Sequence, residues 1–430
     1  MENTYLSDIA DYENQEATFN GWVYNTRSVG KIWFLILRDG TGMTQCVVTR
    51  DDTPNDIFCL EKSLTQESSV SVTGVVKKEP RSVGGHEILV KNIVVHQVAE
   101  KYPITPKEHG TSFLMDHRHL WIRSKKQHAI LKIRHQVVKA CRDFLDNNGF
   151  ILIDAPIFTA NACEGTSNLF AVDYFERSAY LTQSGQLYSE ATAASFGKVY
   201  CFGPTFRAEK SKTRRHLTEF WMVEPEMAYY NLDDNMNLAE LFVEYIVQSC
   251  LKYCQTELKT LERDISKLEN VKVPFPRITY DEAAKILEDQ GSEFTYGSDF
   301  GGTDETIISD QYDKPVMVHR WPAKIKAFYM KRDAENDSLA LGLDMLAPEG
   351  YGEIIGGGQR EDDLAILENR IKEHDLDMKD FGWYLDLRKY GSVPHSGFGL
   401  GIERTVAWIT GIKHIRETIP FPRTIYRLDP

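Results

Sequence analysis

Six side chains that can carry positive charge lie within one short segment, FRAEKSKTRRHLTEF (206–220). These are Arg207, Lys210, Lys212, Arg214, Arg215 and His216. Guanidinium groups suit the bidentate binding of phosphate, and the ring of Phe220 could stack on a flat base. The same charges would suit the solvated tip of a β-hairpin. This segment alone therefore leaves a phosphate site and a plain charged hairpin open.

A second segment, GFGLGIERTVAW (397–408), favours the phosphate site. Three glycines alternate before Glu403 and Arg404, and an apolar helical pattern follows. Glycine allows a ligand to approach the backbone closely. Arginine in the first turn of an otherwise buried helix is costly unless an anion accompanies it. A glycine-rich bend before a helix is common, so this second segment is only moderately specific.

The elements that must position these residues fall into two parts. At roughly 100–200 residues per domain, the 430 residues predict two or three domains. Residues 15–98 read as short strands with alternating polarity and glycine-bearing turns, which is typical of a small β-barrel or sandwich. The segment KYPITPKEHG (101–110), with two prolines and a glycine, predicts a linker into the next domain.

Beyond the linker the apolar spacing changes to three and four residues, which predicts an amphipathic helix from Lys126 to about Asn147. A strand is predicted for FILIDAPIF (150–158), a long helix for 238–268 and a shorter helix for 362–372. Sheet-forming apolar runs lie between the helices. The predicted architecture is therefore an α+β domain behind a small β domain.

Composition limits the class of protein. The chain carries a formal net charge of −13, which neither requires nor excludes a nucleic-acid partner. The sequence shows no secretory signal pattern and no apolar run of membrane-spanning length, so we expect no membrane association. Seven scattered cysteines fit a reducing compartment, and a cytoplasmic location is predicted. Cys250 and Cys254 lie one helical turn apart, which favours core packing over a metal site.

Together these segments resemble the class II aminoacyl-tRNA synthetases. The F-R-x-E pattern, basic loop and E-F pattern are similar to the second motif of that family, and GLGIER is similar to the third. The helix before Phe150 and the ILIDAPIF strand resemble the first motif, which implies a homodimer. The implied fold is a six- or seven-stranded antiparallel sheet flanked by helices. An OB-fold anticodon-binding domain at 1–100, a linker at 101–125 and a catalytic domain at 126–430 match the aspartyl, asparaginyl and lysyl subgroup.

The resemblance implies an ATP site in which Arg207 and Arg404 are the catalytic residues. Arg207 would hold the α-phosphate and the amino-acid carboxylate, whereas Arg404 would hold the γ-phosphate side. The remaining implied ATP contacts are Glu209, Arg215, His216, Phe220, Glu353 and Gly401. Asp344 and Glu353 would hold Mg²⁺, which prefers oxygen ligands. Asp344 could also be only a charge at a strand edge.

The implied amino-acid site favours L-asparagine. Family members specific for aspartate have lysine at the position of Ser189, which pairs with the substrate carboxylate, and that cation is missing here. Glu224 would accept a hydrogen bond from the asparagine amide and repel aspartate, and Arg360 would donate to the amide oxygen. Glu226 shares the strand face of Glu224 and is the alternative. The complete implied set is Glu164, which would bind the substrate ammonium, with Gln186, Ser189, Glu224 and Arg360.

The front domain carries the implied anticodon contacts, Arg27, Phe34, Gln45 and Glu87. Base stacking on Phe34 and edge hydrogen bonds from Gln45 and Glu87 suit recognition of single-stranded RNA by an OB fold. Phe34 could equally be an aromatic residue of the barrel core. The predicted partner is tRNA(Asn), and the predicted reaction is ATP-dependent attachment of asparagine to its 3′ end.

Three alternatives stay open. An aspartate-specific synthetase is disfavoured by Ser189 and Glu224. An asparagine synthetase-like enzyme on the same fold would lack the front barrel. An inactive RNA-binding relative is disfavoured because Arg207, Glu353 and Arg404 are all present.

Overall fold

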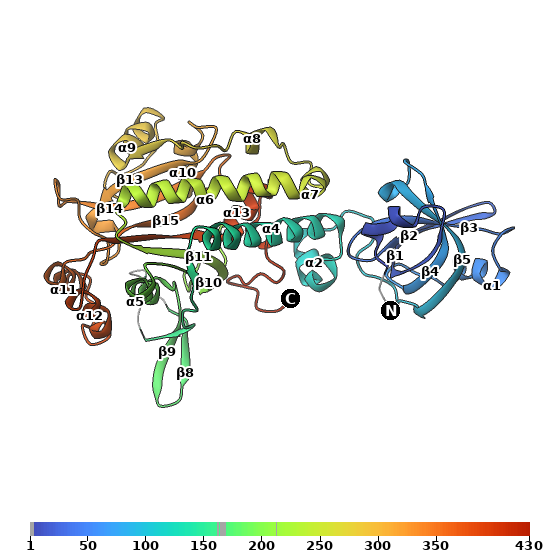
Figure 1. Ribbon diagram of the computed structural model, residues 1–430, viewed down its shortest axis with the longest axis horizontal. Coiled ribbons are helices and arrows are strands. Elements are labelled where there is room, and N and C mark those ends of the chain that lie inside the picture. The colour runs from blue at the N-terminus through green and yellow to red at the C-terminus, as the bar shows by residue number, and fades with distance from the viewer. Residues whose placement is uncertain (1–3, 161–162, 164–168, 212) are drawn as a thin grey trace. The chain divides into compact units, whose positions relative to one another are not determined.

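The computed structural model describes residues 4–160, 163, 169–211 and 213–430 of the chain (Figure 1). The chain divides into two compact units, Met1–Thr111 and Ser112–Pro430. The division between them falls within the stretch 101–125 that the sequence predicts as a linker. Glu164 lies outside the described residues, so the structure carries no information on its predicted role.

The N-terminal unit is a closed barrel with the strand order β1-β2-β3-β5-β4. Its strands are β1 (Glu16–Val29), β2 (Ile32–Arg38), β3 (Met43–Thr49), β4 (Ser69–Lys78) and β5 (His86–Gln97). Side chains of a strand alternate between its two faces. Trp33, Leu35 and Leu37 of β2 therefore fill the barrel core, and each is fully buried. Phe34 lies between them on the other face and is half-buried, so it is not a core residue.

The C-terminal unit contains an eight-stranded sheet with the order β12-β13-β14-β15-β16-β11-β10-β6. The six strands from β13 to β10 pair antiparallel, whereas β12 and β6 add parallel edges. The six antiparallel strands agree with the six- or seven-stranded antiparallel sheet that the family resemblance implies, and one parallel strand extends the sheet at each edge. The strands are β6 (Ile151–Leu152), β10 (Lys198–Phe206), β11 (Glu219–Ala228), β12 (Arg277–Thr279), β13 (Val316–Pro322), β14 (Leu339–Ala347), β15 (Gly352–Gln359) and β16 (His395–Gly401).

Three helices pack on one face of this sheet and form the main core with it (Figure 1). They are α4 (Lys125–Asn147), α6 (Leu232–Tyr253) and α13 (Ile402–Thr410). The apolar stripe of α4 includes the fully buried Ile130, Ile133 and Val137, at the three- and four-residue spacing of a helix face. Cys250 and Cys254 belong to the same apolar core.

Two predicted elements differ from the observed ones. The segment 150–158 is not one strand, because it divides into β6 and β7 (Phe158–Thr159), and β7 joins a separate sheet of order β7-β9-β8. Pro156 lies between them and has no N–H for a ladder. The predicted helix 238–268 is three helices, and the first begins earlier because Asn231 caps it by accepting from the Asp234 N–H.

The remaining elements connect and flank this framework. The helices are α1 (Asn55–Cys59), α2 (Thr111–Asp116), α3 (Arg118–Trp121), α5 (Gln186–Phe196), α7 (Gln255–Thr260), α8 (Ser266–Glu269), α9 (Tyr280–Asp289), α10 (Gly302–Ser309), α11 (Leu364–Glu373) and α12 (Gly382–Lys389). The other strands are β8 (Ala171–Tyr174) and β9 (Arg177–Leu181). Among the helices of the described ranges, none is both long and apolar enough to cross a bilayer.

Candidate active site

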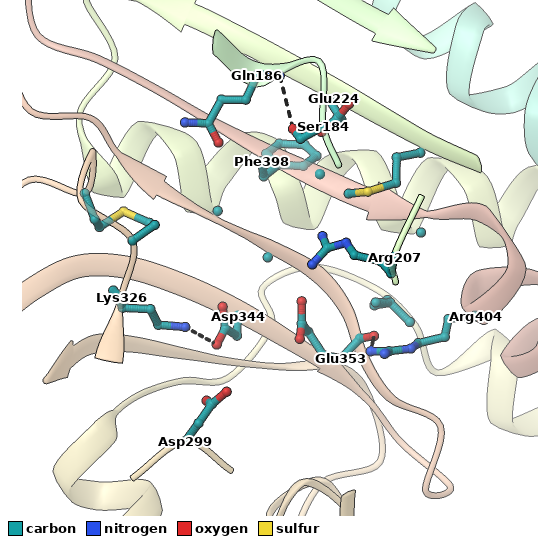
Figure 2. A pocket seen from close by; sticks show the side chains of 18 of the residues that line it. Ser184, Gln186, Arg207, Glu224, Asp299, Lys326, Asp344, Glu353, Phe398 and Arg404 are labelled. Carbon is teal, nitrogen blue, oxygen red and sulfur yellow. Dashed lines mark hydrogen bonds and ion pairs between the residues drawn. The ribbon is translucent and has the colours of Figure 1, made fainter. Parts of the chain in front are cut away.

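A cavity of about 700 Å³ lies against the sheet, and strands β11, β14, β15 and β16 contribute to its walls (Figure 2). Alternate residues of β11 face it, namely Phe220, Met222, Glu224 and Glu226. Successive side chains of a strand point to opposite faces, so every second residue of β11 points to the cavity. The strand runs along the cavity, and these residues therefore reach both of its ends. Residues from the connection between β10 and β11 also line the cavity, namely Arg207, Glu209, Arg215, His216 and Leu217.

One end of the cavity is lined by arginines. Arg207 follows β10 directly, and its guanidinium carbon lies 5.9 Å from the ring centre of Phe220. Arg404 lies in the first turn of α13, and its Nη1 donates to the carbonyl oxygen of Glu353. Both arginines line the cavity, and the anion-binding role predicted for them stays a prediction. Arg207 and Arg404 are 197 positions apart in the sequence, and the fold places both on the wall of one cavity.

Arg215 also lines the cavity, and neighbouring elements engage both of its terminal nitrogens. Nη1 lies 3.2 Å from a carboxylate oxygen of Glu305 and 3.1 Å from the Gly302 carbonyl oxygen. Nη2 donates to Thr306 Oγ1 at 2.9 Å and to the Gly350 carbonyl oxygen. Arg215 thus ties the hairpin loop to α10, a role that the sequence analysis missed.

His216 and Glu209 come from the same loop and line the cavity. His216 Nδ1 is hydrogen-bonded to Thr213 Oγ1. Burial lowers the pKa of His216, and the neighbouring Arg404 lowers it further. The lowered pKa favours the neutral form of the ring at neutral pH in the unliganded protein.

Two carboxylates, one from β14 and one from β15, face the arginines across the cavity. Figure 2 shows the side chains of Asp344 and Glu353 pointing into the cavity. A Cβ atom placed on Gly356 would lie 2.6 Å from Glu353 Oε1 and 3.7 Å from Asp344 Oδ1, so these oxygens converge over one glycine. Lys326 Nζ lies 2.6 Å from Asp344 Oδ2. Burial raises the pKa of Asp344 to about 7, although Lys326 opposes that rise.

The three alternating glycines of the segment 397–408 have two different roles. A Cβ atom on Gly397 would lie 2.1 Å from Glu226 Oε2, and one on Gly399 would lie 2.2 Å from Met222 Cε. Strand β11 requires glycine at position 397, because a Cβ atom there would also lie 2.5 Å from the Pro225 carbonyl oxygen. The flexible end of the Met222 side chain could move away from a Cβ atom on Gly399. A Cβ atom on Gly401 would meet no described atom within 4 Å, and Gly401 lines the cavity. Of the three, Gly401 is the position that fits the predicted approach of a ligand.

The other end of the cavity is built around buried carboxylates. Glu224 accepts hydrogen bonds from Ser184 Oγ, from the Gly185 N–H at 2.9 Å and from Cys201 Sγ at 3.2 Å. Gly185 precedes α5, so the loop before that helix fixes the orientation of the Glu224 carboxylate. Burial raises the pKa of the Cys201 thiol, and the adjacent Glu224 raises it further.

Glu226 and Arg360 form a bidentate ion pair in the same region. Arg360 Nε lies 3.0 Å and Nη2 lies 2.9 Å from the two carboxylate oxygens of Glu226. Both residues are buried and line the cavity. Burial raises the pKa of Glu226, whereas its pair with Arg360 lowers it. Glu226 is thus the partner that holds Arg360, and Glu224 is the carboxylate that the Ser184–Gly185 loop holds.

Of the predicted contacts to the amino-acid substrate, Gln186 lines the cavity and Ser189 does not. Gln186 lines the cavity from the first turn of α5. Ser189 is fully buried and is not among the described residues that line the cavity. The lining of the cavity does not support a contact between Ser189 and the substrate, and its role stays a prediction.

The predicted anticodon residues lie close together on the barrel. Arg27 is paired with Phe34 across β1 and β2, and its guanidinium carbon lies 4.6 Å from the ring centre. Gln45 Nε2 donates to Glu87 Oε2 at 3.3 Å across β3 and β5. Each pair stands on neighbouring strands, so the four side chains can form one continuous binding face.

An antiparallel sheet with an arginine-lined cavity, together with a separate five-stranded barrel, defines the architecture of a class II aminoacyl-tRNA synthetase. The family model described as "tRNA synthetases class II (D, K and N)" matches residues 110–425. The model described as "OB-fold nucleic acid binding domain" matches residues 17–95. The chain belongs to the class II tRNA synthetases of the D, K and N group.

The relatives that align with the full length of the chain include asparagine–tRNA ligases. The chain is 59% identical to an asparagine–tRNA ligase of Sorangium cellulosum over 437 aligned positions, covering 99% of this chain and 98% of that protein. It is 55% identical to an asparagine–tRNA ligase of Desulforamulus reducens, with complete coverage of both chains. Its fold matches the crystal structure of asparaginyl-tRNA synthetase from Pyrococcus horikoshii complexed with asparaginyl-adenylate, with a TM-score of 0.97 and 45% identity over 100% of both chains.

Proposed function

We propose that this chain attaches L-asparagine to tRNA at the expense of ATP. The observation that carries the proposal is one cavity with two chemically different ends. Arg207 and Arg404 line one end, and the buried Glu224 and the Glu226–Arg360 pair line the other. The full-length relatives named above support the same activity.

The acidic end is suited to an amide. Glu224 can accept a hydrogen bond from the asparagine NH₂ group, since each carboxylate oxygen has two lone pairs. The Glu226 pair uses Nε and Nη2 of Arg360. We therefore assign Nη1 as the donor to the amide oxygen. The carboxylate of aspartate would meet the like charge of Glu224, so the same residue disfavours the wrong substrate.

The basic end is suited to activation of the substrate carboxylate. In the proposed reaction a carboxylate oxygen of asparagine attacks the α-phosphorus of ATP, pyrophosphate leaves, and asparaginyl-adenylate forms. Arg207 would orient the α-phosphate and the attacking carboxylate, and Phe220 would stack on adenine. Positioning and charge neutralisation supply most of the catalysis in such reactions. The 3′-hydroxyl of the terminal tRNA adenosine then takes the asparaginyl group, and AMP leaves.

Magnesium is proposed at Asp344 and Glu353. The convergence of their oxygens over Gly356 fits the oxygen ligands that this cation prefers. Bound Mg²⁺ would neutralise charge on the triphosphate. Lys326 engages Asp344 Oδ2, which directs Oδ1 toward the cavity side shared with Glu353.

The partners follow from the two units of the chain. We propose that the barrel binds the anticodon of tRNA(Asn) through the face formed by Arg27, Phe34, Gln45 and Glu87. A homodimer through the segment around α4 and β6 is proposed from the motif resemblance, and a solution mass of twice 49.3 kDa would support it. A cytoplasmic location remains a prediction.

The proposed activity is tested by ATP–pyrophosphate exchange on the purified protein without tRNA. Asparagine and aspartate are compared as separate substrates under identical conditions. Exchange with asparagine alone is expected. Exchange with aspartate alone would support the proposed ATP site but refute the role given to Glu224. Exchange with neither amino acid would refute the synthetase activity.

A further inference from the structure

Glu190 of α5 is a buried carboxylate for which the proposed reaction has no direct use. Its Oε2 lies 2.8 Å from Arg388 Nη2 and 2.9 Å from His395 Nε2. Its Oε1 accepts from Gln186 Nε2 at 3.0 Å, and the hydroxyl of Tyr384 lies 2.8 Å from both oxygens. Burial alone would raise the pKa of Glu190, but Arg388 and His395 hold it well below its usual range. Glu190 is therefore a fixed anion.

Gln186 connects this anion to the cavity. Gln186 and Glu190 are four residues apart on α5, so their side chains are neighbours on one helix face. Glu190 itself is not among the described residues that line the cavity, whereas Gln186 is. An ionised carboxylate only accepts hydrogen bonds, so the Gln186 NH₂ group, and not its oxygen, must face Glu190. The amide oxygen is consequently directed away from Glu190.

We propose that Glu190 is a positioning residue, which turns the amide oxygen of Gln186 toward the cavity as the acceptor for the ammonium group of the substrate. This inference rests on the proposed function. Glu224 and Arg360 are already assigned to the side-chain amide of the substrate. Glu164, which the family resemblance assigns to the ammonium group, lies outside the described residues; an ammonium group has three N–H donors and can take a further acceptor beside it. The ammonium group has only donors, so it requires an acceptor with a fixed orientation.

Replacing Glu190 by glutamine would reverse that orientation. The new amide oxygen must remain next to Arg388, because a buried guanidinium left without an acceptor is strongly unfavourable. The new NH₂ group then faces Gln186, and two NH₂ groups cannot hydrogen-bond to each other. Gln186 turns its oxygen toward position 190 and presents its NH₂ group to the ammonium. A lost bond to a charged group corresponds to about a ten- to hundredfold rise in the KM for asparagine.

The experiment measures pyrophosphate exchange for wild type, Glu190→Gln and the control Glu240→Gln. Glu240 is also a buried carboxylate paired with an arginine, Arg277, and it is not among the described residues that line the cavity. We expect Glu190→Gln to raise the KM for asparagine and leave the KM for ATP unchanged. The Ki of succinamic acid, which is asparagine without its amino group, should also stay unchanged. The control should match wild type in all three constants.

A double-mutant cycle tests whether Glu190 acts through Gln186. In a Gln186→Met background, Glu190→Gln should raise the KM for asparagine no further. Additive effects, or a parallel rise in the Ki of succinamic acid, would overturn the proposal. If Glu190→Gln does not fold, the pair Glu190→Leu and Arg388→Met is measured instead. It removes both charges and leaves the Gln186 amide without its orienting acceptor, so a smaller rise in the KM for asparagine is expected. Absence of wild-type exchange with asparagine would refute the proposed function itself and is measured first.

Discussion

Glu224→Gln is the substitution that tests the proposed choice between asparagine and aspartate most directly. The glutamine amide has nearly the shape of the carboxylate and can keep most of its contacts. Its oxygen can accept from the Gly185 N–H and Cys201, while its NH₂ group donates to Ser184 Oγ, a hydroxyl that can also accept. The variant should therefore fold, and it loses the negative charge and the carboxylate acceptor that face the substrate.

The expected change in specificity follows from two contributions. Asparagine loses a hydrogen bond to a charged acceptor, which is worth about 1.5 kcal/mol or more. Aspartate is relieved of a like-charge repulsion, which we take to be of similar size because the groups would share one water-poor site. Together these amount to about 3 kcal/mol, so the ratio of kcat/KM for asparagine over aspartate should fall about hundredfold.

The assay is pyrophosphate exchange with each amino acid over a full concentration range, with thermal unfolding of each variant as a check on folding. Glu240→Gln is the matched control, because it neutralises another buried carboxylate that is not among the described cavity residues. The asparagine-to-aspartate ratio of the control should equal that of wild type. A Glu224→Gln variant that is folded, active and unchanged in this ratio would refute the assignment. Glu190→Gln should leave the same ratio unchanged, which separates the two carboxylates.

Three further predictions follow from the cavity and the barrel. Arg207→Ala should lower exchange by at least about a hundredfold, since preorganised charge stabilisation is lost; an unaltered exchange rate would contradict the catalytic role. The Mg²⁺ concentration for half-maximal exchange should rise about tenfold for each pH unit below 7. The reason is that a proton competes with the cation at Asp344, whose pKa burial raises to about 7. Asp344→Asn should abolish that pH dependence, and a flat wild-type profile would count against the proposed site. Phe34→Ala should weaken tRNA binding about ten- to hundredfold, as loss of one base stack does, with exchange unaffected; equal tRNA affinity in a filter-binding assay would return Phe34 to a structural role.

Local patterns in the sequence were sufficient to predict the elements that carry the site. Alternating polarity through much of residues 15–98 predicted barrel strands. The segment IWFLIL in β2 is apolar throughout, so its period alone left the orientation of Phe34 open. Closure of the barrel decided it, because Trp33, Leu35 and Leu37 fill the interior. Pattern also failed at 150–158, where an apolar run with proline divides between two sheets.

The sequence by itself determined the chemistry that the chain can offer, since residue types and their spacing within motifs are local properties. It placed Arg207 and Phe220 on one hairpin and Arg404 at the start of a helix. Only the tertiary structure decided which residues meet across long separations. Arg360 pairs with Glu226 at a separation of 134 positions, and Arg388 pairs with Glu190 at a separation of 198. Such pairs depend on strand order and helix packing, which no local period encodes, and they decide which carboxylate holds an arginine and which can face the substrate.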